Sequence, residues 1–177
     1  MTLRETLEKV KEIIGESFDL DEQGVKRDRL MASGISVYDE LTCDYVHLKA
    51  EESVEFIDGI CPFSAFSNKV KDILSVKRQG KPINFEMYPL FVRCEGLSGE
   101  AEVKYYYLPP EPEADSELIL PPRFSVHMLA NGIAAEYFYR SGMPDEAAYY
   151  RNRYEYSLNN AQARLRNLTL KADRIIC

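Results

Sequence analysis

Residues 101–122 read AEVKYYYLPPEPEADSELILPP, and this stretch decides the fold class because its pattern changes partway along. In the first eight residues apolar and polar side chains alternate, so that Ala101, Val103 and Tyr105 share one face of a strand. From residue 108 on, five of the nine prolines of the chain occur within 15 residues. Proline excludes this acidic, extended segment from a central strand or a helix interior. The sequence therefore predicts a strand followed by a proline-rich loop, 108–122.

Two helices are predicted after this loop. The first covers about 123–141, begins after a pair of prolines and ends at Gly142. The last helix covers about 145–168, with Pro144 in its first turn and acidic residues at the positive end of its dipole. Both helices carry apolar residues at helical spacing. These residues are Val126, Leu129, Ile133, Tyr137 and Phe138, and then Ala147, Tyr150, Tyr154, Leu158, Ala161, Leu165 and Leu168.

Helical spacing also governs the first part of the chain. Thr2-Leu3-Arg4-Glu5 has the form of a capping box and predicts a helix over about 3–14. A second helix is expected from about residue 21 to Tyr45. After His47 the pattern becomes that of short strands separated by turns. The expected strands are 53–57, 71–76, 83–87 and 90–94, in addition to the one that begins at Ala101.

These elements predict an α+β fold in which a β region interrupts a helical one. Residues 1–47 and 122–177 are expected to form one antiparallel four-helix bundle, built from two N-terminal and two C-terminal helices. Residues 48–121 are expected to form a small inserted antiparallel β subdomain, which carries the acidic proline-rich loop.

The composition is that of an ordinary globular chain. It has 177 residues, of which 45% are apolar and 29% are charged, and its net charge is −7. The sequence has no run of 18 apolar residues, which excludes a membrane-spanning helix, and it opens on an amphipathic pattern rather than an export signal. The negative charge argues against a general nucleic-acid coat protein.

Few residues are suited to catalysis or to metal binding. The two histidines and four cysteines form no CxxC motif and no Cys/His cluster, so we expect no zinc site. Four cysteines would allow two disulfides in a secreted protein, whereas free thiols are expected without an export signal. The sequence holds neither a phosphate-binding loop nor a nucleophile elbow. We therefore predict no catalytic residues, no cofactor, no metal and a protein that is not an enzyme.

The charge is distributed unevenly along the chain. Residues 1–121 hold 14 Lys and Arg against 24 Asp and Glu, whereas residues 122–177 hold 8 against 5. The last residues combine positive charge with bulky apolar side chains, which suits docking onto a partner protein. Packing of the isoleucines on the chain's own helices is the alternative. The predicted partner-interface residues are Arg166, Lys171, Arg174, Ile175 and Ile176.

The order of motifs resembles that of the head-to-tail adaptor proteins of tailed bacteriophages and prophages, which are also called neck, connector or head-completion proteins. The resemblance covers nearly the whole chain. Its residues are Tyr38-Asp39-Glu40-Leu41 with Asp44-Tyr45, Asp58-Gly59, Val76 with Gly80-Lys81-Pro82-Ile83, Gly99 with Val103 to Pro109, Leu120-Pro121-Pro122, Ala130 to Tyr137, Gly142, Glu146-Ala147, and Tyr154 with Leu158.

The resemblance implies an assembly role without catalysis. Proteins of this family form a homo-oligomeric ring of roughly twelve subunits beneath the portal protein, through a heterologous cyclic interface. The ring extends the DNA channel, through which DNA passes without specific binding, and offers a platform to stopper or tail proteins. The implied location is the virion neck, and the bacterial host cytoplasm during assembly. The isolated chain is expected to be either a monomer or part of a ring.

A tetratricopeptide-like helical protein-binding module of a cytosolic bacterial protein is the alternative. The residues similar to those of a tetratricopeptide helix pair are Ala134, Tyr137, Gly142, Ala147, Tyr154 and Leu158. However, the sequence shows no second copy at the 34-residue period of such repeats, and isolated repeats are unstable.

Overall fold

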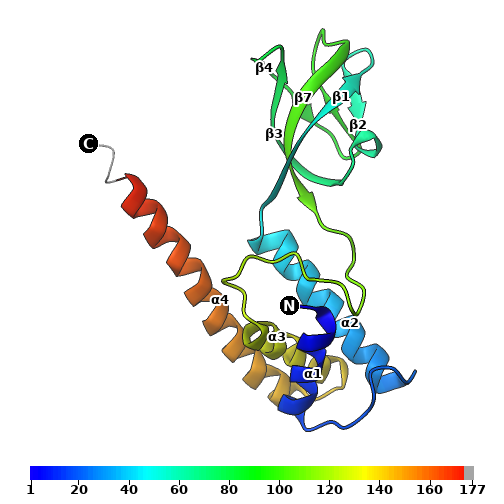
Figure 1. The fold of residues 1–177 in the computed structure, drawn as a ribbon, viewed down its shortest axis with the longest axis vertical. Coiled ribbons are helices and arrows are strands. Elements are labelled where there is room, and N and C mark those ends of the chain that lie inside the picture. Colours follow the sequence, from blue (N-terminus) through cyan, green and yellow to red (C-terminus); the bar gives the residue numbers. More distant parts are fainter. Residues whose placement is uncertain (174–177) are drawn as a thin grey trace. The chain divides into compact units, whose positions relative to one another are not determined.

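The computed structural model describes the backbone of residues 1–173 and the side chains of residues 1–163. The chain divides into two compact units. The helical unit contains Met1–Leu41 together with the chain from Glu111 onward, and the β unit contains Thr42–Pro110. Figure 1 shows the elements of both units.

The helical unit contains α1 (Leu3–Ile14), α2 (Val25–Glu40), α3 (Val126–Arg140) and α4 (Pro144–Asp173). The capping box at the start of α1 is confirmed, because the Thr2 hydroxyl accepts a hydrogen bond from the Glu5 amide and the Glu5 carboxylate accepts one from the Thr2 amide. Helix α2 begins four residues later than expected and ends at Glu40 in a π-helical turn, Leu41–Tyr45.

The predicted antiparallel four-helix bundle is wrong. A bundle helix buries one stripe and leaves the opposite face to solvent. Here α3 is buried on all sides over its middle, since each of the eight residues from Met128 to Ala135 is buried. Helices α1, α2 and α4 all pack on α3, most extensively α4 (Figure 1). The helical unit is therefore arranged around a central helix.

Two glycines allow this close packing. A Cβ atom at Gly132 of α3 would lie 2.9 Å from the Tyr154 ring of α4 and 3.1 Å from Val37 of α2. A Cβ atom at Gly34 of α2 would lie 3.0 Å from Leu3 of α1. Both are points of close helix approach: a Cβ atom at Gly132 would overlap the Tyr154 ring, whereas at Gly34 the leucine methyl groups would have to shift slightly.

The proline-rich loop divides between the two units, and its residues from Glu111 onward belong to the helical unit. The Arg4 amide donates to the Ala114 carbonyl at 2.7 Å, and the Arg4 guanidinium binds Asp115 at 2.6 Å and Asp21 at 2.9 Å. These contacts fasten the loop to α1. The unit boundaries therefore fall at 41/42 and 110/111, where the sequence analysis had placed them at 47/48 and 121/122.

The β unit contains seven strands in two antiparallel sheets. The four-stranded sheet has the order β1-β7-β3-β4, with β1 (Leu48–Phe56), β7 (Gly99–Leu108), β3 (Lys69–Arg78) and β4 (Lys81–Ile83). The three-stranded sheet has the order β2-β6-β5, with β2 (Ile60–Pro62), β6 (Phe91–Arg93) and β5 (Glu86–Met87). A short 3₁₀ turn, Phe63–Ala65, follows β2.

A separate hydrophobic core lies inside the β unit. The alternation predicted for the strand that begins near Ala101 is confirmed, because Ala101, Val103 and Tyr105 are buried and Glu102 is exposed. Buried residues of both sheets contribute to this core. They are Val54, Phe56, Cys61, Phe66, Ile73, Val76, Val92, Cys94, Leu97, Ala101, Val103 and Tyr105.

Candidate functional site

The predicted partner interface falls at the limit of what the structure describes. Arg166 and Lys171 lie within the backbone of α4, in the part whose side chains are not described. Arg174, Ile175 and Ile176 lie outside the described residues. The interface formed by these five residues therefore stays a prediction.

The two histidines belong to different units of the chain. The His47 ring lies 5.0 Å from the Tyr106 ring in the β unit, while the His127 carbonyl accepts a hydrogen bond from the buried Asn131 side chain in α3. Among the residues for which side chains are described, no group of three or more His, Cys, Asp or Glu residues could hold a metal ion.

Cys61 and Cys94 are both fully buried free thiols in the core of the β unit. Burial raises the pKa of the Cys61 thiol to about 11, and burial also raises the pKa of Cys94. A thiol reacts as its thiolate, and a raised pKa keeps both cysteines protonated and therefore unreactive as nucleophiles at neutral pH. We assign them a packing role.

A hydrogen-bonded carboxylate lies on the inner side of β1. The Glu52 carboxylate accepts hydrogen bonds from the Ser67 amide at 3.1 Å, from the Ser67 hydroxyl at 2.6 Å and from the hydroxyl of the buried Tyr105. Burial acts to raise the pKa of Glu52, but these hydrogen bonds outweigh it and hold the pKa below its ordinary value. These hydrogen bonds link β1 to β7 and to the segment before β3. We therefore assign Glu52 a structural role.

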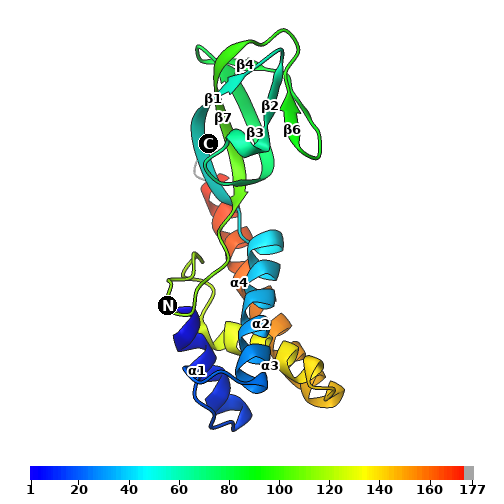
Figure 2. The ribbon, with the colours of Figure 1, turned by 90° about the vertical axis from the view of Figure 1, so that its right-hand side faces the viewer.

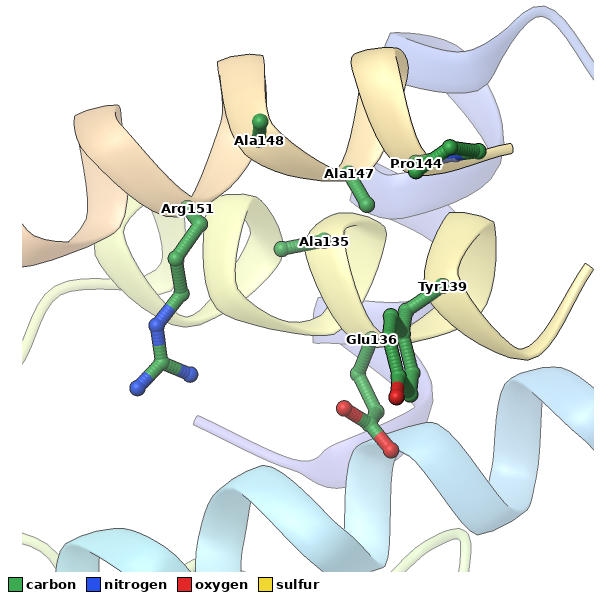
Figure 3. Close-up of a pocket in the computed structure, with 7 residues that line it drawn as sticks. All are labelled: Ala135, Glu136, Tyr139, Pro144, Ala147, Ala148 and Arg151. Atoms are coloured by element: carbon green, nitrogen blue, oxygen red, sulfur yellow. The ribbon is translucent and has the colours of Figure 1, made fainter. Parts of the chain in front are cut away.

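An apolar groove runs between α3 and α4 in the helical unit, with a volume of about 420 Å³ (Figure 3). The alanines of the two helices form its floor, and the exposed Tyr139 and Arg151 stand at opposite ends. Small side chains leave the groove open at the surface. The lining residues are Ala135, Glu136, Tyr139, Pro144, Ala147, Ala148 and Arg151.

The charged residues of the groove are held in fixed positions by ion pairs. Glu136 binds Arg140 of its own helix at 2.8 Å. The Arg151 guanidinium makes two hydrogen bonds of 3.2 Å to the Glu40 carboxylate of α2 and one of 2.9 Å to Glu155. The groove therefore has an apolar floor flanked by charged side chains that already form ion pairs within the helical unit.

The outer face of the three-stranded sheet carries exposed apolar side chains beside the charged Arg93 and Glu86. Ile60 pairs with Arg93, and Pro62 pairs with Phe91, on the side opposite the buried pair Cys61 and Val92. The Tyr88 ring stacks on Phe91 with ring centroids 4.7 Å apart. Figure 2 shows β2 and β6 side by side at one margin of the β unit. We call Ile60, Pro62, Glu86, Tyr88, Phe91 and Arg93 the outer sheet face.

Sequence reasoning missed both surfaces, although signals for each were present. Alanines at the facing positions of two consecutive helices, such as Ala135 and Ala148, indicate a shallow surface groove. Residues 60–62 and 90–92 are apolar at successive positions, which indicates strands with two apolar faces. The strand 60–62 was not predicted because three residues are too few for a period to be recognised.

Within the described residues, no helix has both the length and the apolar character that crossing a bilayer requires. No protein-family model matches the chain, and no curated protein is significantly similar to it.

Proposed function

We propose that this protein is a structural assembly protein of a tailed bacteriophage or prophage, an adaptor whose copies form a ring between the portal and the stopper or tail proteins. In this role it acts in the virion neck, after assembly in the cytoplasm of a bacterial host. DNA passes through the ring without specific binding, and the protein performs no catalysis.

The observation that carries the proposal is the order of the adaptor-like motifs along the chain. At several of these motif positions the backbone conformation or the packing excludes most other side chains. Gly59 turns β1 into β2 with φ +80°, and a Cβ atom there would lie 2.6 Å from the Cys94 carbonyl oxygen. Gly132 lies against the fully buried Tyr154, and Gly142, with φ +74°, separates α3 from α4.

The two apolar surfaces give further support. Each copy in a ring contacts one neighbour on either side through two different surfaces, because a cyclic interface is heterologous. In the proposed ring, the groove between α3 and α4 and the outer sheet face are the candidate contact surfaces, and they belong to different units of the chain. Contiguous apolar patches on a soluble chain mark interaction sites.

A tetratricopeptide-like binding module is the second candidate, because α3 and α4 form a close antiparallel pair with an apolar groove. Modules of this kind stack successive helix pairs on one another. In the helical unit α1 and α2 instead pack individually on α3. The adaptor proposal accounts for the inserted β unit as well, and we prefer it.

The test is removal of residues 171–177, the segment proposed to dock onto the portal. The truncated protein should retain its free energy of unfolding to within about 1 kcal/mol, because the segment serves a partner. It should no longer co-sediment with rings of the portal protein that the proposal requires in the same genome. In a control variant, a Gly/Ser segment of equal length replaces residues 171–177. This variant keeps the chain length but lacks the charged and apolar side chains, and it should also fail to bind portal rings. A truncated protein that still binds portal rings, or that unfolds, would contradict the proposed docking.

A further inference from the structure

The chain passes from one unit to the other at two points, 41/42 and 110/111. At the first point no loop intervenes, because α2 runs directly into the π-helical turn Leu41–Tyr45. The backbone of Leu41 is still helical, with φ −64° and ψ −44°. The unit boundary therefore falls inside a continuous helical segment, and the π-helical turn after Leu41 belongs to the β unit.

The side chain of Lys71 in β3 binds this π-helical turn. Its ammonium group donates hydrogen bonds to the Thr42 carbonyl at 3.3 Å and to the Cys43 carbonyl. The last carbonyls of a helical segment have no partner within the helix, and a lysine near that end satisfies them and offsets the negative end of the helix dipole. The contact thus ties the first residues of the β unit to its four-stranded sheet.

A β-bulge directs Lys71 to this contact. Val70 of β3 pairs with Tyr107 of β7, whereas Asp72 pairs with the adjacent Tyr106, so the register shifts at Lys71. Lys71 is therefore the extra residue of a bulge, and bulges bend a strand and redirect a side chain. Helical turns of the π type are rare and occur frequently at functional sites. One ammonium group thus joins two backbone irregularities that lie beside a unit boundary.

The second crossing point is anchored in the helical unit. The backbone carbonyl of Ala114 and the carboxylate of Asp115 both accept hydrogen bonds from Arg4 of α1. Between the end of β7 at Leu108 and these contacts the chain contains the sequence Pro109-Pro110-Glu111-Pro112. Proline fixes the backbone φ angle near −65°, which leaves this connection little freedom. Each crossing is therefore short, and each is held by a cationic side chain on one side.

We propose that Lys71 is a clamp that fixes the direction in which the β unit leaves α2. With the ammonium in place, the π-helical turn moves as part of the β unit, and the freedom of the joint is confined to its two crossing points. Without the ammonium, the last helical carbonyls lose their partner and the turn can unwind from β3. The inference concerns the single chain and goes beyond the proposed ring function.

Distances between spin labels in the two units, measured by double electron–electron resonance, test this proposal. The labels are attached through Val25→Cys at the start of α2 and Leu90→Cys in the β unit, both at exposed positions. The background carries Cys43→Ser and Cys177→Ser, so that only buried native cysteines remain. The change at Cys43 keeps the backbone carbonyl that Lys71 binds.

Three variants of this labelled protein separate the ammonium group from other effects. Lys71→Met keeps the apolar stem, removes the ammonium, and should broaden the distribution of distances at least about twofold. Lys71→Arg can still donate to two carbonyls and should keep the original width. Lys69→Met is the matched control, because it removes an exposed lysine two residues earlier on the same strand, and it should also keep the original width.

A second pair of labels, placed within the β unit at Glu55→Cys and Leu90→Cys, separates the joint from the fold. Its distance should be the same in every variant. An unchanged width between the units in Lys71→Met, or equal broadening in Lys71→Arg or Lys69→Met, would overturn the proposal. A changed distance within the β unit, or a Lys71→Met protein that does not fold, would also overturn it, because Lys71 would then maintain the sheet and not the joint.

Discussion

At the scale of single residues, the β unit depends on one carboxylate that is ionised near its core. Glu52 lies on the inner side of β1, a position where an unpaired charge would be costly. Three hydrogen bonds from Ser67 and Tyr105 satisfy it. Burial raises the pKa of the Tyr105 hydroxyl, and the hydrogen bond to the Glu52 carboxylate raises it further.

The replacement Glu52→Gln should destabilise the protein in a manner that depends on pH. The folded pKa of Glu52 is lowered from its ordinary value of 4.5, so its contribution is fully present above pH 4.5 and is lost as the pH falls through the folded pKa. Because the side chain is partly exposed, we expect a difference of up to about 1 kcal/mol at pH 7. Urea unfolding of both proteins at pH 7 and pH 3 measures it.

The exposed neighbour provides the control for this measurement. Glu51→Gln removes only a surface pair with Lys104 and should change the free energy of unfolding by less than about 0.5 kcal/mol. If the difference between wild type and Glu52→Gln stays the same or grows at pH 3, the assigned role of the carboxylate is wrong.

At the scale of elements, α3 determines how the helical unit is built. Its run of small residues lets three helices reach its backbone, and Gly132 marks the closest approach. Glycine inside a helix costs about 1 kcal/mol relative to alanine, so its presence here needs a packing reason. The fully buried Tyr154 ring supplies this reason.

Gly132→Ala therefore should lower the stability, although helix propensity alone predicts an increase. The new Cβ atom would lie 2.9 Å from a ring that cannot move away, and we expect a net loss of about 1–2 kcal/mol. Gly34→Ala is the matched control, because its nearest atoms are flexible leucine methyl groups and the loss should be smaller. Thermal unfolding measures both variants, and a Gly132→Ala protein more stable than wild type would refute the packing argument.

The loop after the β unit is an element held by charge. Hydrogen bonds to Asp115 and then to Asp21 raise the pKa of the Arg4 guanidinium. Burial has the opposite effect on this pKa and is the smallest of the contributions. Arg4→Met should release the loop, so that amide hydrogen exchange accelerates over residues 114–118 while α2 and α3 keep their protection. Lys9→Met, which removes only the exposed pair with Glu12, should leave exchange in the loop unchanged. Unchanged exchange in Arg4→Met would show that the loop is held by its backbone contacts.

Local signals predicted the elements better than their arrangement. The capping box at Thr2 and the alternation from Ala101 are determined by near neighbours in the sequence, and both are found in the structure. The central position of α3 was missed because helical periodicity suggests one buried stripe, whereas Met128–Ala135 is buried all round. The cluster of small residues within this run was the available signal. The alanines of α3 and α4 and the apolar residues of 60–62 and 90–92 were local signals for the groove and the outer sheet face, but the pairing of β2 with β6 joins segments about 30 residues apart and no local pattern specifies it.

At the scale of the whole molecule, one unit is inserted into the other and each has its own apolar core. Among the residues whose side chains are described, each unit also carries exposed apolar side chains, in the α3–α4 groove and on the outer sheet face. A chain with two such surfaces can contact two neighbours at once, as a subunit of a ring must. The net charge of −7 is compatible with a channel along which DNA slides, because a basic lumen would retain phosphates.

The most direct measurement of the adaptor proposal is the mass of portal rings mixed with an excess of this protein, obtained by native mass spectrometry. The proposal requires a portal gene in the genome that carries this sequence, and the product of such a gene is the partner to use. We expect each portal ring to gain roughly twelve copies, one for each portal subunit, with no intermediate number stably populated. Portal rings whose mass is unchanged at saturating protein, or that gain only one or a few copies, would contradict the proposal.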